Sequence, residues 1–190
     1  MYYIQKRLFD IILSIILLFL TFIPCMLIAF LIKFSSKGNI LFWSDRIGLN
    51  NKLFKMPKFR SMVDNTPLVA THCLKESNIF ITPIGKFIRR TSIDEIPQLW
   101  SIFIGDMTFV GPRPALYSQI DLIELRTIHN IHLIKPGLTG WAQINGRDEI
   151  SIPKKIELDY YYLLNQSFLL DILILFKTLF KVILFKNISH

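Results

Sequence analysis

Residues 11–32 read IILSIILLFLTFIPCMLIAFLI, an unbroken run of 22 uncharged side chains. A straight helix of this length is about 33 Å long, which is enough to cross the hydrocarbon core of a membrane. Pro24 lies inside the run, where its ring removes a backbone donor and disfavours a straight helix. Positive charges flank the run on both sides, at Lys6, Arg7, Lys33 and Lys37. This symmetry leaves two topologies open: a spanning helix, and a re-entrant helix that bends at Pro24 and returns to the same face.

The rest of the chain has room for one domain of ordinary size. Of the 190 residues of the whole chain, 52% are hydrophobic, and the mean hydropathy of the chain is +0.42. We therefore expect a membrane element at residues 1–36 and a compact domain at 37–190. A second apolar stretch at 163–185 is interrupted by Asp171, Lys177 and Lys181. Its spacing favours an amphipathic helix in the membrane interface, with lysines extended toward the headgroups, and a core helix of the domain is the open alternative.

The net charge of +8 narrows the classes of partner. Strongly basic proteins bind nucleic acids, anionic membranes or phosphorylated molecules. Nucleic-acid-binding modules carry a recognisable motif or a basic stripe with interleaved aromatic residues, and this sequence contains neither. We therefore expect no nucleic-acid partner, and instead expect contact with membrane lipids and phosphate groups.

Turn residues divide the domain into short elements. We expect a strand at 40–43, a turn at 46–51, a basic aromatic stretch at 53–62, and helices at 83–90, 92–105 and 116–129. Ser92 and Glu95 fit a capping box at the start of the second of these helices. Short helices joined by loops rich in glycine and proline predict an α-rich α/β fold without a long regular sheet.

Two adjacent carboxylates, Asp94 and Glu95, are the first candidates for chemistry. At the N-terminus of a helix, the dipole and the free N–H groups stabilise anions. An aspartate in this place stays ionised and can act as a nucleophile or a metal ligand, while its neighbour can hold a proton or a metal-bound water. Acidic residues are also common in the first turn of ordinary helices, so the pair alone does not decide between chemistry and capping.

Arginines in nearby loops strengthen the case for chemistry. Arg89 and Arg90 precede the acidic pair, Arg113 lies between two prolines, and Arg147 follows an Asn-Gly turn. A guanidinium group binds phosphate oxygens through two N–H donors, and a loop stiffened by proline loses little entropy when it presents one. A carboxylate pair near several arginines suits a phosphorylated, metal-bound substrate. Arginines of an ordinary protein surface are the alternative.

Four sequence motifs follow one another along the chain. They are KFRSM at 58–62, RRTSIDEIPQL at 89–99, GDMTFVGPRP at 105–114 and PGLTGWAQINGR at 136–147. In this order they resemble the bacterial sugar transferase family, the small monotopic phosphoglycosyl transferases. The resemblance extends from KRLFD at 6–10 to SFLLD at 167–171, so it covers nearly the whole chain.

The resemblance implies a specific reaction. Members of this family move a sugar 1-phosphate from a UDP-sugar to undecaprenyl phosphate or another polyprenol phosphate and release UMP, which is the first membrane step of surface glycan assembly. By this resemblance, Asp94 is the nucleophile that forms a covalent phosphosugar intermediate in a ping-pong sequence. Glu95 supports the metal-bound arrangement or manages the proton of the acceptor. Mg²⁺ is the implied cofactor, with Asp94 as its ligand. The implied substrate contacts are Arg89, Arg113, Arg147 and Lys58.

The resemblance also implies a topology. It favours a re-entrant helix broken at Pro24, which places both chain ends and the catalytic domain at 37–190 on the cytoplasmic face of the bacterial inner membrane. The sequence departs from the family at Ile23, where many members have a serine whose hydroxyl bonds a freed carbonyl. Downstream glycosyltransferases are further candidate partners. The alternative function is a catalytically silent membrane adaptor of a glycan-assembly complex, which the intact Asp94 and Glu95 disfavour.

Overall fold

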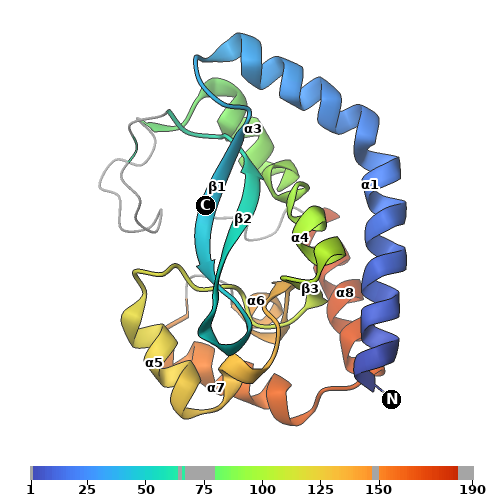
Figure 1. Ribbon diagram of the computed structural model, residues 1–190, viewed down its shortest axis with the longest axis vertical. Helices are drawn as coiled ribbons and strands as arrows, with labels where there is room; N and C mark the ends of the chain where they lie inside the picture. Colours follow the sequence, from blue (N-terminus) through green and yellow to red (C-terminus); the bar gives the residue numbers. More distant parts are fainter. Residues whose placement is uncertain (1, 64–65, 67–79, 147–149, 184–190) are drawn as a thin grey trace.

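The computed structural model describes residues 2–63, 66, 80–146 and 150–183. These residues form a helix-rich fold with two small sheets, which confirms the predicted α-rich α/β class (Figure 1). The helices are α1 (Tyr2–Ser35), α3 (Pro83–Arg90), α4 (Gln98–Ile104), α5 (Ile120–Ile128), α6 (Trp141–Asn145), α7 (Ile152–Leu164) and α8 (Phe168–Ile183). The strands are β1 (Leu41–Ile47), β2 (Leu53–Phe59), β3 (Thr108–Val110) and β4 (Gly137–Thr139). Short 3₁₀ turns connect them at η1 (Leu49–Asn51), η3 (Ile93–Glu95) and η4 (Ile131–Leu133).

Helix α1 runs without interruption through Pro24. The predicted break at this residue is therefore not present: the helix bends instead, and its C-terminal part leans toward α3 (Figure 1). Proline keeps a helical φ and removes a single N–H group, so a long apolar helix accommodates it with a bend. Within the part of the chain that the structure describes, α1 alone is long and apolar enough to cross a membrane. Its outward-facing side chains are largely apolar and include Phe19, Phe22 and Ile23.

The two sheets are small, and each joins segments that carry predicted site residues. β1 and β2 form an antiparallel hairpin in which Leu41 faces Phe59. The strand expected at 40–43 is therefore longer than predicted, and the basic stretch that follows it forms its partner. β3 and β4 pair in parallel, with Thr108 opposite Gly137. This second sheet places residues 108–110, which precede Arg113, beside residues 137–139 of another motif.

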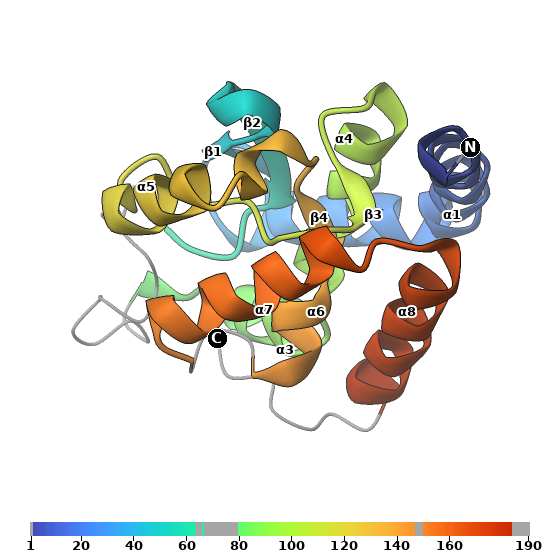
Figure 2. The same ribbon diagram turned by 90° about the horizontal axis from the view of Figure 1, so that it is seen from below.

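The main core lies between α1, α4, α8 and the β3–β4 sheet. Its buried members include Ile102, Met107, Phe109 and Ile174. Seen from below, the N-terminal part of α1 is viewed nearly end-on beside α4 and α8 (Figure 2). Arg7 of α1 donates to the carbonyl oxygens of Ile102 and Phe103 at 2.7 and 2.8 Å, where α4 ends. The N-terminal part of α1 is therefore packed into the same unit as the domain predicted at 37–190.

Helix α8 is apolar both on the face that it buries and on much of the face that it exposes. Ile174 is fully buried. The exposed face presents Leu169, Phe176, Leu179 and Phe180. The lysines predicted to extend toward headgroups instead fold back onto α6. Lys177 Nζ lies 5.6 Å from the centre of the Trp141 ring, and Lys181 Nζ donates to the Ile144 carbonyl at 2.6 Å. This carbonyl belongs to the last turn of α6, where the helix itself provides no donor, so the lysine satisfies it.

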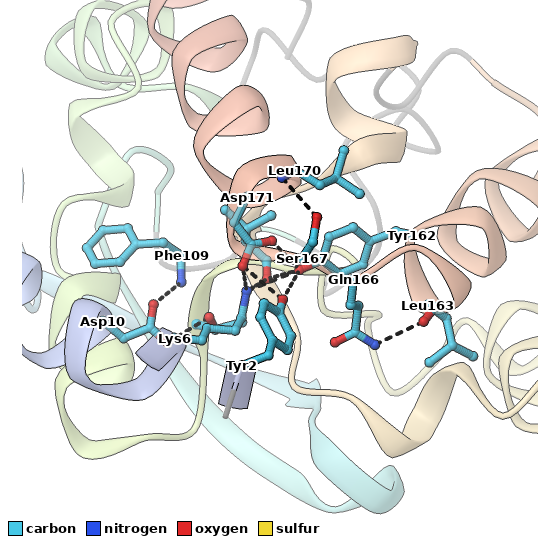
Figure 3. Close-up of polar contacts among 12 residues, drawn as sticks. Tyr2, Lys6, Asp10, Phe109, Tyr162, Leu163, Gln166, Ser167, Leu170 and Asp171 are labelled. Carbon is cyan, nitrogen blue, oxygen red and sulfur yellow. Dashed lines mark hydrogen bonds and ion pairs between the residues drawn. The ribbon is translucent and has the colours of Figure 1, made fainter. Parts of the chain in front are cut away.

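A buried polar cluster, here called the α1 clamp, joins the first turns of α1 to α7, α8 and β3 (Figure 3). Its members are Tyr2, Lys6, Tyr162, Asp171 and the carbonyl of Val110. Lys6 Nζ lies 2.6 Å from Asp171 Oδ2 and donates to the Val110 carbonyl at 2.8 Å. The Tyr162 and Tyr2 hydroxyls donate to the two oxygens of Asp171 at 2.6 and 2.9 Å. Asp171 is 4% exposed, so these donors must replace the water that would otherwise solvate its charge.

Replacing Asp171 with alanine is expected to destabilise the protein by about 3–5 kcal/mol, because it leaves the Lys6 ammonium buried without its counter-charge. Thermal unfolding of the detergent-solubilised protein measures this change. Glu157→Ala is the matched control, since Glu157 pairs with Lys154 at 2.7 Å on the exposed surface of α7, and its loss should cost at most about 1 kcal/mol. Equal melting temperatures for the two variants would contradict the stabilising role of the α1 clamp.

Candidate active site

The acidic pair Asp94-Glu95 lies in η3, a 3₁₀ turn between α3 and α4. The predicted capping box is wrong, because Ser92 has left-handed backbone angles (φ 56°) and its side chain makes no capping hydrogen bond. Pro97 has no N–H to donate to the Ile93 carbonyl, so α4 begins only at Gln98. The acidic pair therefore lies in a short 3₁₀ turn that precedes α4, and not in the first turn of a longer helix.

Asp94 is buried, with 6% of its surface exposed. Its Oδ1 has no hydrogen-bond partner among the described residues, and Lys58 Nζ lies 3.9 Å from its Oδ2. Burial, reinforced by the negative charge of Glu95, raises the pKa of Asp94 to about 6 against the opposing pull of Lys58, Arg89 and Arg113. This carboxyl group therefore titrates close to neutral pH, whereas an exposed aspartate titrates near pH 4.

Glu95 is held by two cations on one oxygen. Its Oε1 accepts from Lys58 Nζ at 2.8 Å and from Arg113 Nη2 at 3.1 Å. Burial alone would raise the pKa of Glu95, but the charges and hydrogen bonds of Lys58 and Arg113 outweigh it and lower that pKa below its ordinary value. The pKa values of the two neighbouring carboxyl groups are thus shifted in opposite directions. Glu95 remains an anion at all working pH values, and Asp94 changes its charge near neutrality.

The fold brings three of the predicted phosphate-binding side chains to the acidic pair. Lys58 comes from the end of β2, Arg113 from the loop after β3, and Arg89 from the last turn of α3. Arg89 is 9% exposed; burial lowers its pKa, while the charges of Asp94 and Glu95 raise it. The fourth predicted residue, Arg147, lies outside the described residues.

The loop at residues 110–115, here called the Arg113 loop, carries Arg113 toward Glu95. Its two prolines restrict φ, as the sequence predicts. Gly111 allows the loop to approach the segment of β4 closely: its N–H donates to the Thr139 carbonyl at 2.8 Å, and a Cβ atom at this position would lie 2.5 Å from the Lys135 carbonyl oxygen. Only glycine fits such a backbone contact. The loop is therefore anchored to β4 immediately before it presents Arg113.

The acidic pair fits a magnesium ion that is shared with a substrate. The buried Oδ1 of Asp94, which lacks a hydrogen-bond partner in the described part of the chain, is an anionic oxygen available to a cation. Mg²⁺ takes one or two carboxylates and completes its shell with water and substrate phosphates. No group of three or more acidic, histidine or cysteine side chains among the described residues could hold the ion without a substrate. Glu95 is committed to Lys58 and Arg113, so Asp94 fits the role of the protein ligand.

Comparison with known sequences identifies the family. The sequence model described as bacterial sugar transferase matches residues 1–185. The chain belongs to the bacterial sugar transferase family. Membership confirms the resemblance carried by the four motifs, and with it the prediction that the protein is an enzyme.

Relatives of this sugar transferase include one described only by its family and two with named activities. It is 40% identical over 187 residues to the uncharacterized sugar transferase EpsL of Bacillus subtilis (strain 168), a match that covers 98% of this chain and 91% of the relative. It is 38% identical over 180 residues to the UDP-N-acetylgalactosamine-undecaprenyl-phosphate N-acetylgalactosaminephosphotransferase of Aeromonas hydrophila, covering 92% of this chain and 42% of the relative. It is 40% identical over 189 residues to the UDP-glucose:undecaprenyl-phosphate glucose-1-phosphate transferase of Klebsiella pneumoniae, a match that covers 93% of this chain and 39% of the relative. The chain thus spans less than half the length of these last two proteins.

Two residues that lie behind the candidate active site were not predicted from the sequence. Arg126 in α5 donates to the carbonyl of Arg113 at 2.8 Å, and Asp159 in α7 lies 2.6 Å from Arg126. Neither residue belongs to one of the four motifs. They are 33 positions apart in the sequence, so no local spacing indicates that they meet.

Proposed function

We propose that this sugar transferase moves a sugar 1-phosphate from a UDP-sugar to undecaprenyl phosphate and releases UMP. The observation that carries the proposal is a buried carboxyl group, Asp94, next to a second carboxylate that binds two cations. Such a site suits a diphosphate, whose charge needs cationic donors while an anionic nucleophile approaches it. The names of the Aeromonas and Klebsiella relatives support the donor and acceptor classes.

In the proposed first step, an ionised oxygen of Asp94 attacks the phosphorus that carries the sugar. A P–O bond forms to the carboxylate, the bond from this phosphorus to the bridging oxygen breaks, and UMP leaves with the electron pair. The product is an acyl phosphate that links Asp94 to the sugar. The raised pKa of Asp94 makes its ionised form a stronger nucleophile than an exposed aspartate, provided that the pH is above about 6.

In the proposed second step, a phosphate oxygen of the acceptor attacks the same phosphorus. The bond to Asp94 breaks, and the carboxylate is restored. Lys58, Arg89 and Arg113 stabilise the charge on the phosphoryl oxygens, and Arg147 stays a prediction as a fourth contact. Because Glu95 is held as an anion by two cations, we assign it the role of positioning Lys58 and Arg113, in preference to transferring the acceptor's proton.

We also propose Mg²⁺ as the metal, with Asp94 as its protein ligand and the substrate phosphates as the others. When bound, it would neutralise charge that otherwise repels the carboxylate from the diphosphate. The cations of the protein approach the acidic pair mainly through Glu95, since Lys58 lies 2.8 Å from Glu95 but 3.9 Å from Asp94. Asp94 therefore has less of its charge compensated by the protein than its neighbour.

We further propose that α1 is re-entrant and that the domain lies on the cytoplasmic face of the bacterial inner membrane. The support is that both ends of α1 pack on one domain. Lys6 is bound by Asp171 in the α1 clamp, while Ile32 near the other end is fully buried in a cluster that contains Phe59 and Ile88. A helix whose two ends contact the same folded unit cannot place those ends on opposite sides of a bilayer.

Accessibility labelling tests this topology. A single cysteine at Tyr3→Cys, in a background with Cys25 and Cys73 replaced by serine, should react with a membrane-impermeant maleimide in inverted vesicles and not in spheroplasts. Tyr3 is 66% exposed, so a reagent can reach this position. Adding Pro24→Ala should straighten α1 and increase labelling in spheroplasts. If the Tyr3→Cys protein that retains Pro24 were labelled in spheroplasts, from the periplasmic side, the re-entrant topology would be contradicted.

The activity itself is tested by UMP release from the purified, detergent-solubilised protein with Mg²⁺, undecaprenyl phosphate and a panel of UDP-sugars. Release with one donor, lost when EDTA removes the metal, is the expected result. Without acceptor, radiolabelled UMP should exchange into that UDP-sugar, because the first step of a ping-pong reaction is reversible. Silence across the panel from protein shown to be folded would overturn the proposed activity and favour the silent membrane adaptor.

A further inference from the structure

The backbone of the Arg113 loop is held by donors from other elements of the fold. The carbonyl oxygens of four successive residues, 112–115, each accept a hydrogen bond. The donors, in that order, are the Gly137 N–H at 2.9 Å, Arg126 Nη1 at 2.8 Å, Arg46 Nη1 at 3.2 Å and the Ile47 N–H at 3.0 Å. Two residues of the loop are prolines and have no N–H group, so the loop depends on these external donors for its shape.

The donor to the Arg113 carbonyl belongs to a buried ion pair. Arg126 in α5 is 8% exposed, and Asp159 in α7 is 1% exposed. Asp159 Oδ2 accepts from Arg126 Nε at 3.1 Å and from Arg126 Nη2 at 2.6 Å, which leaves Nη1 for the Arg113 carbonyl. Because the guanidinium group is planar and rigid, fixing two of its nitrogens on one carboxylate also fixes the direction of the third.

Stability alone does not account for such a pair. Taking two charges out of water costs about as much free energy as their attraction returns, and apolar residues of similar size often stabilise a core equally well. An apolar pair could not supply a directed N–H donor at the Arg113 carbonyl. The hydrogen bond that Arg126 donates to the Arg113 carbonyl therefore distinguishes this ion pair from an apolar replacement.

We propose that Arg126 and Asp159 are positioning residues for Arg113. Asp159 orients Arg126, Arg126 fixes the backbone of Arg113, and the Arg113 side chain then reaches Glu95 Oε1 at 3.1 Å. Through these contacts α5 and α7 determine where the Arg113 guanidinium meets the diphosphate, a consequence that rests on the proposed function. The two residues act through Arg113 and do not themselves bind the substrate.

A double-mutant cycle tests this role. Asp159→Asn and Arg126→Lys are each made in the native chain and in an Arg113→Gln chain. In the native chain each is expected to lower kcat/KM for the UDP-sugar roughly 10- to 100-fold, since small displacements of a substrate-binding group have effects of this size. In the Arg113→Gln chain each should cost less than about 3-fold, because the residue that they position is gone. Equal losses in the two backgrounds would overturn the proposal.

Glu157→Gln is the matched control for the cycle. Glu157 lies on the same helix as Asp159, but it is exposed and pairs with Lys154 on the surface. Its replacement should leave kcat/KM within about 2-fold in both backgrounds. Arg126→Lys keeps the charge that Asp159 needs, so it retains a folded protein if Asp159→Asn does not fold.

Amide hydrogen exchange tests the contact without requiring activity. The N–H groups of Gly111 and Leu116 bracket the loop and bond the Thr139 carbonyl at 2.8 Å and Gln119 Oε1 at 2.9 Å. Both should exchange at least about 10-fold faster in Arg126→Lys and at the native rate in Glu157→Gln. Native exchange in Arg126→Lys would overturn the proposal. If the native protein releases no UMP, the proposed function fails, and this measurement still decides whether the ion pair holds the loop.

Discussion

Asp94→Asn is expected to abolish UMP release and, at the same time, to raise the melting temperature of the protein. Asparagine has nearly the shape of aspartate but cannot form the acyl phosphate, so kcat should fall by about 10⁴-fold or more. Both the release assay and the exchange of labelled UMP into the UDP-sugar should be lost together, because both require the first step.

The gain in stability follows from the burial of the Asp94 charge. A group whose pKa rises from 3.8 to about 6 on folding is harder to ionise in the native state than in the unfolded state. Its ionisation therefore costs folding free energy, roughly 1–3 kcal/mol at pH 7. This cost is absent below pH 4, grows between pH 4 and pH 6 and is constant above. The variant should thus melt several degrees above the native protein at pH 7.5, and the two should converge near pH 4.

Asp106→Asn is the matched control for this experiment. Asp106 is exposed and follows α4, so its replacement should change neither the melting temperature nor UMP release noticeably. Substantial turnover by Asp94→Asn would remove Asp94 as the nucleophile. A melting temperature below that of the native protein at pH 7.5 would show instead that the Asp94 charge is well compensated by Lys58, Arg89 and Arg113.

Glu95→Gln is expected to lower kcat/KM roughly 100-fold and to move the acidic limb of the pH–rate profile. The rate falls because Lys58 and Arg113 lose the anion that holds them in place. In the proposed mechanism, Asp94 must be ionised to attack, so the activity of the native protein should rise with pH and reach half its maximum near pH 6. Removing the negative charge of Glu95 favours the ionised form of Asp94, which lowers the pKa of Asp94 and moves this limb to lower pH.

A profile of kcat/KM between pH 4.5 and pH 8.5 measures both effects, with far-ultraviolet circular dichroism to confirm folding at each pH. Glu124→Gln provides the control, since Glu124 is an exposed residue of α5 and should leave the limb in place. If the limb of Glu95→Gln stayed at its native position or moved to higher pH, the acidic limb would report a group other than Asp94.

Features that depend on a few neighbouring residues were predictable from the sequence. α3 has the expected bounds, because Thr82 accepts from the Gly85 N–H at 2.9 Å and Pro83 suits the first helical position. α4 ends at Gly105 as predicted, since glycine readily adopts the left-handed φ of 99° found there. The proximity of Arg113 to the acidic pair was also expected, although its partner, Glu95, was not specified.

Features that depend on distant residues were not predictable in this way. The residues of a capping box are present at Ser92 and Glu95, but Ser92 has left-handed backbone angles, and the Glu95 carboxylate binds Lys58 and Arg113 from distant segments. Lys58 reaches Glu95 only because the β1–β2 hairpin places the end of β2 against η3. Asp171, which reads as a charge on an interfacial helix, is instead buried against α1. In each case the deciding contact joins segments whose relative position no local pattern specifies.

The α1 clamp also sets an order of events during synthesis. Lys6 precedes its partner Asp171 by 165 positions, which a ribosome covers in about 8–33 s at ordinary rates of translation. Throughout that interval α1 is available to enter the lipid bilayer, while the lysine that will anchor it has no counter-ion. The domain can close around the first turns of α1 only after α8 has been translated. The attachment of α1 to the domain through Lys6 is therefore completed only by α8, the last helix among the described residues.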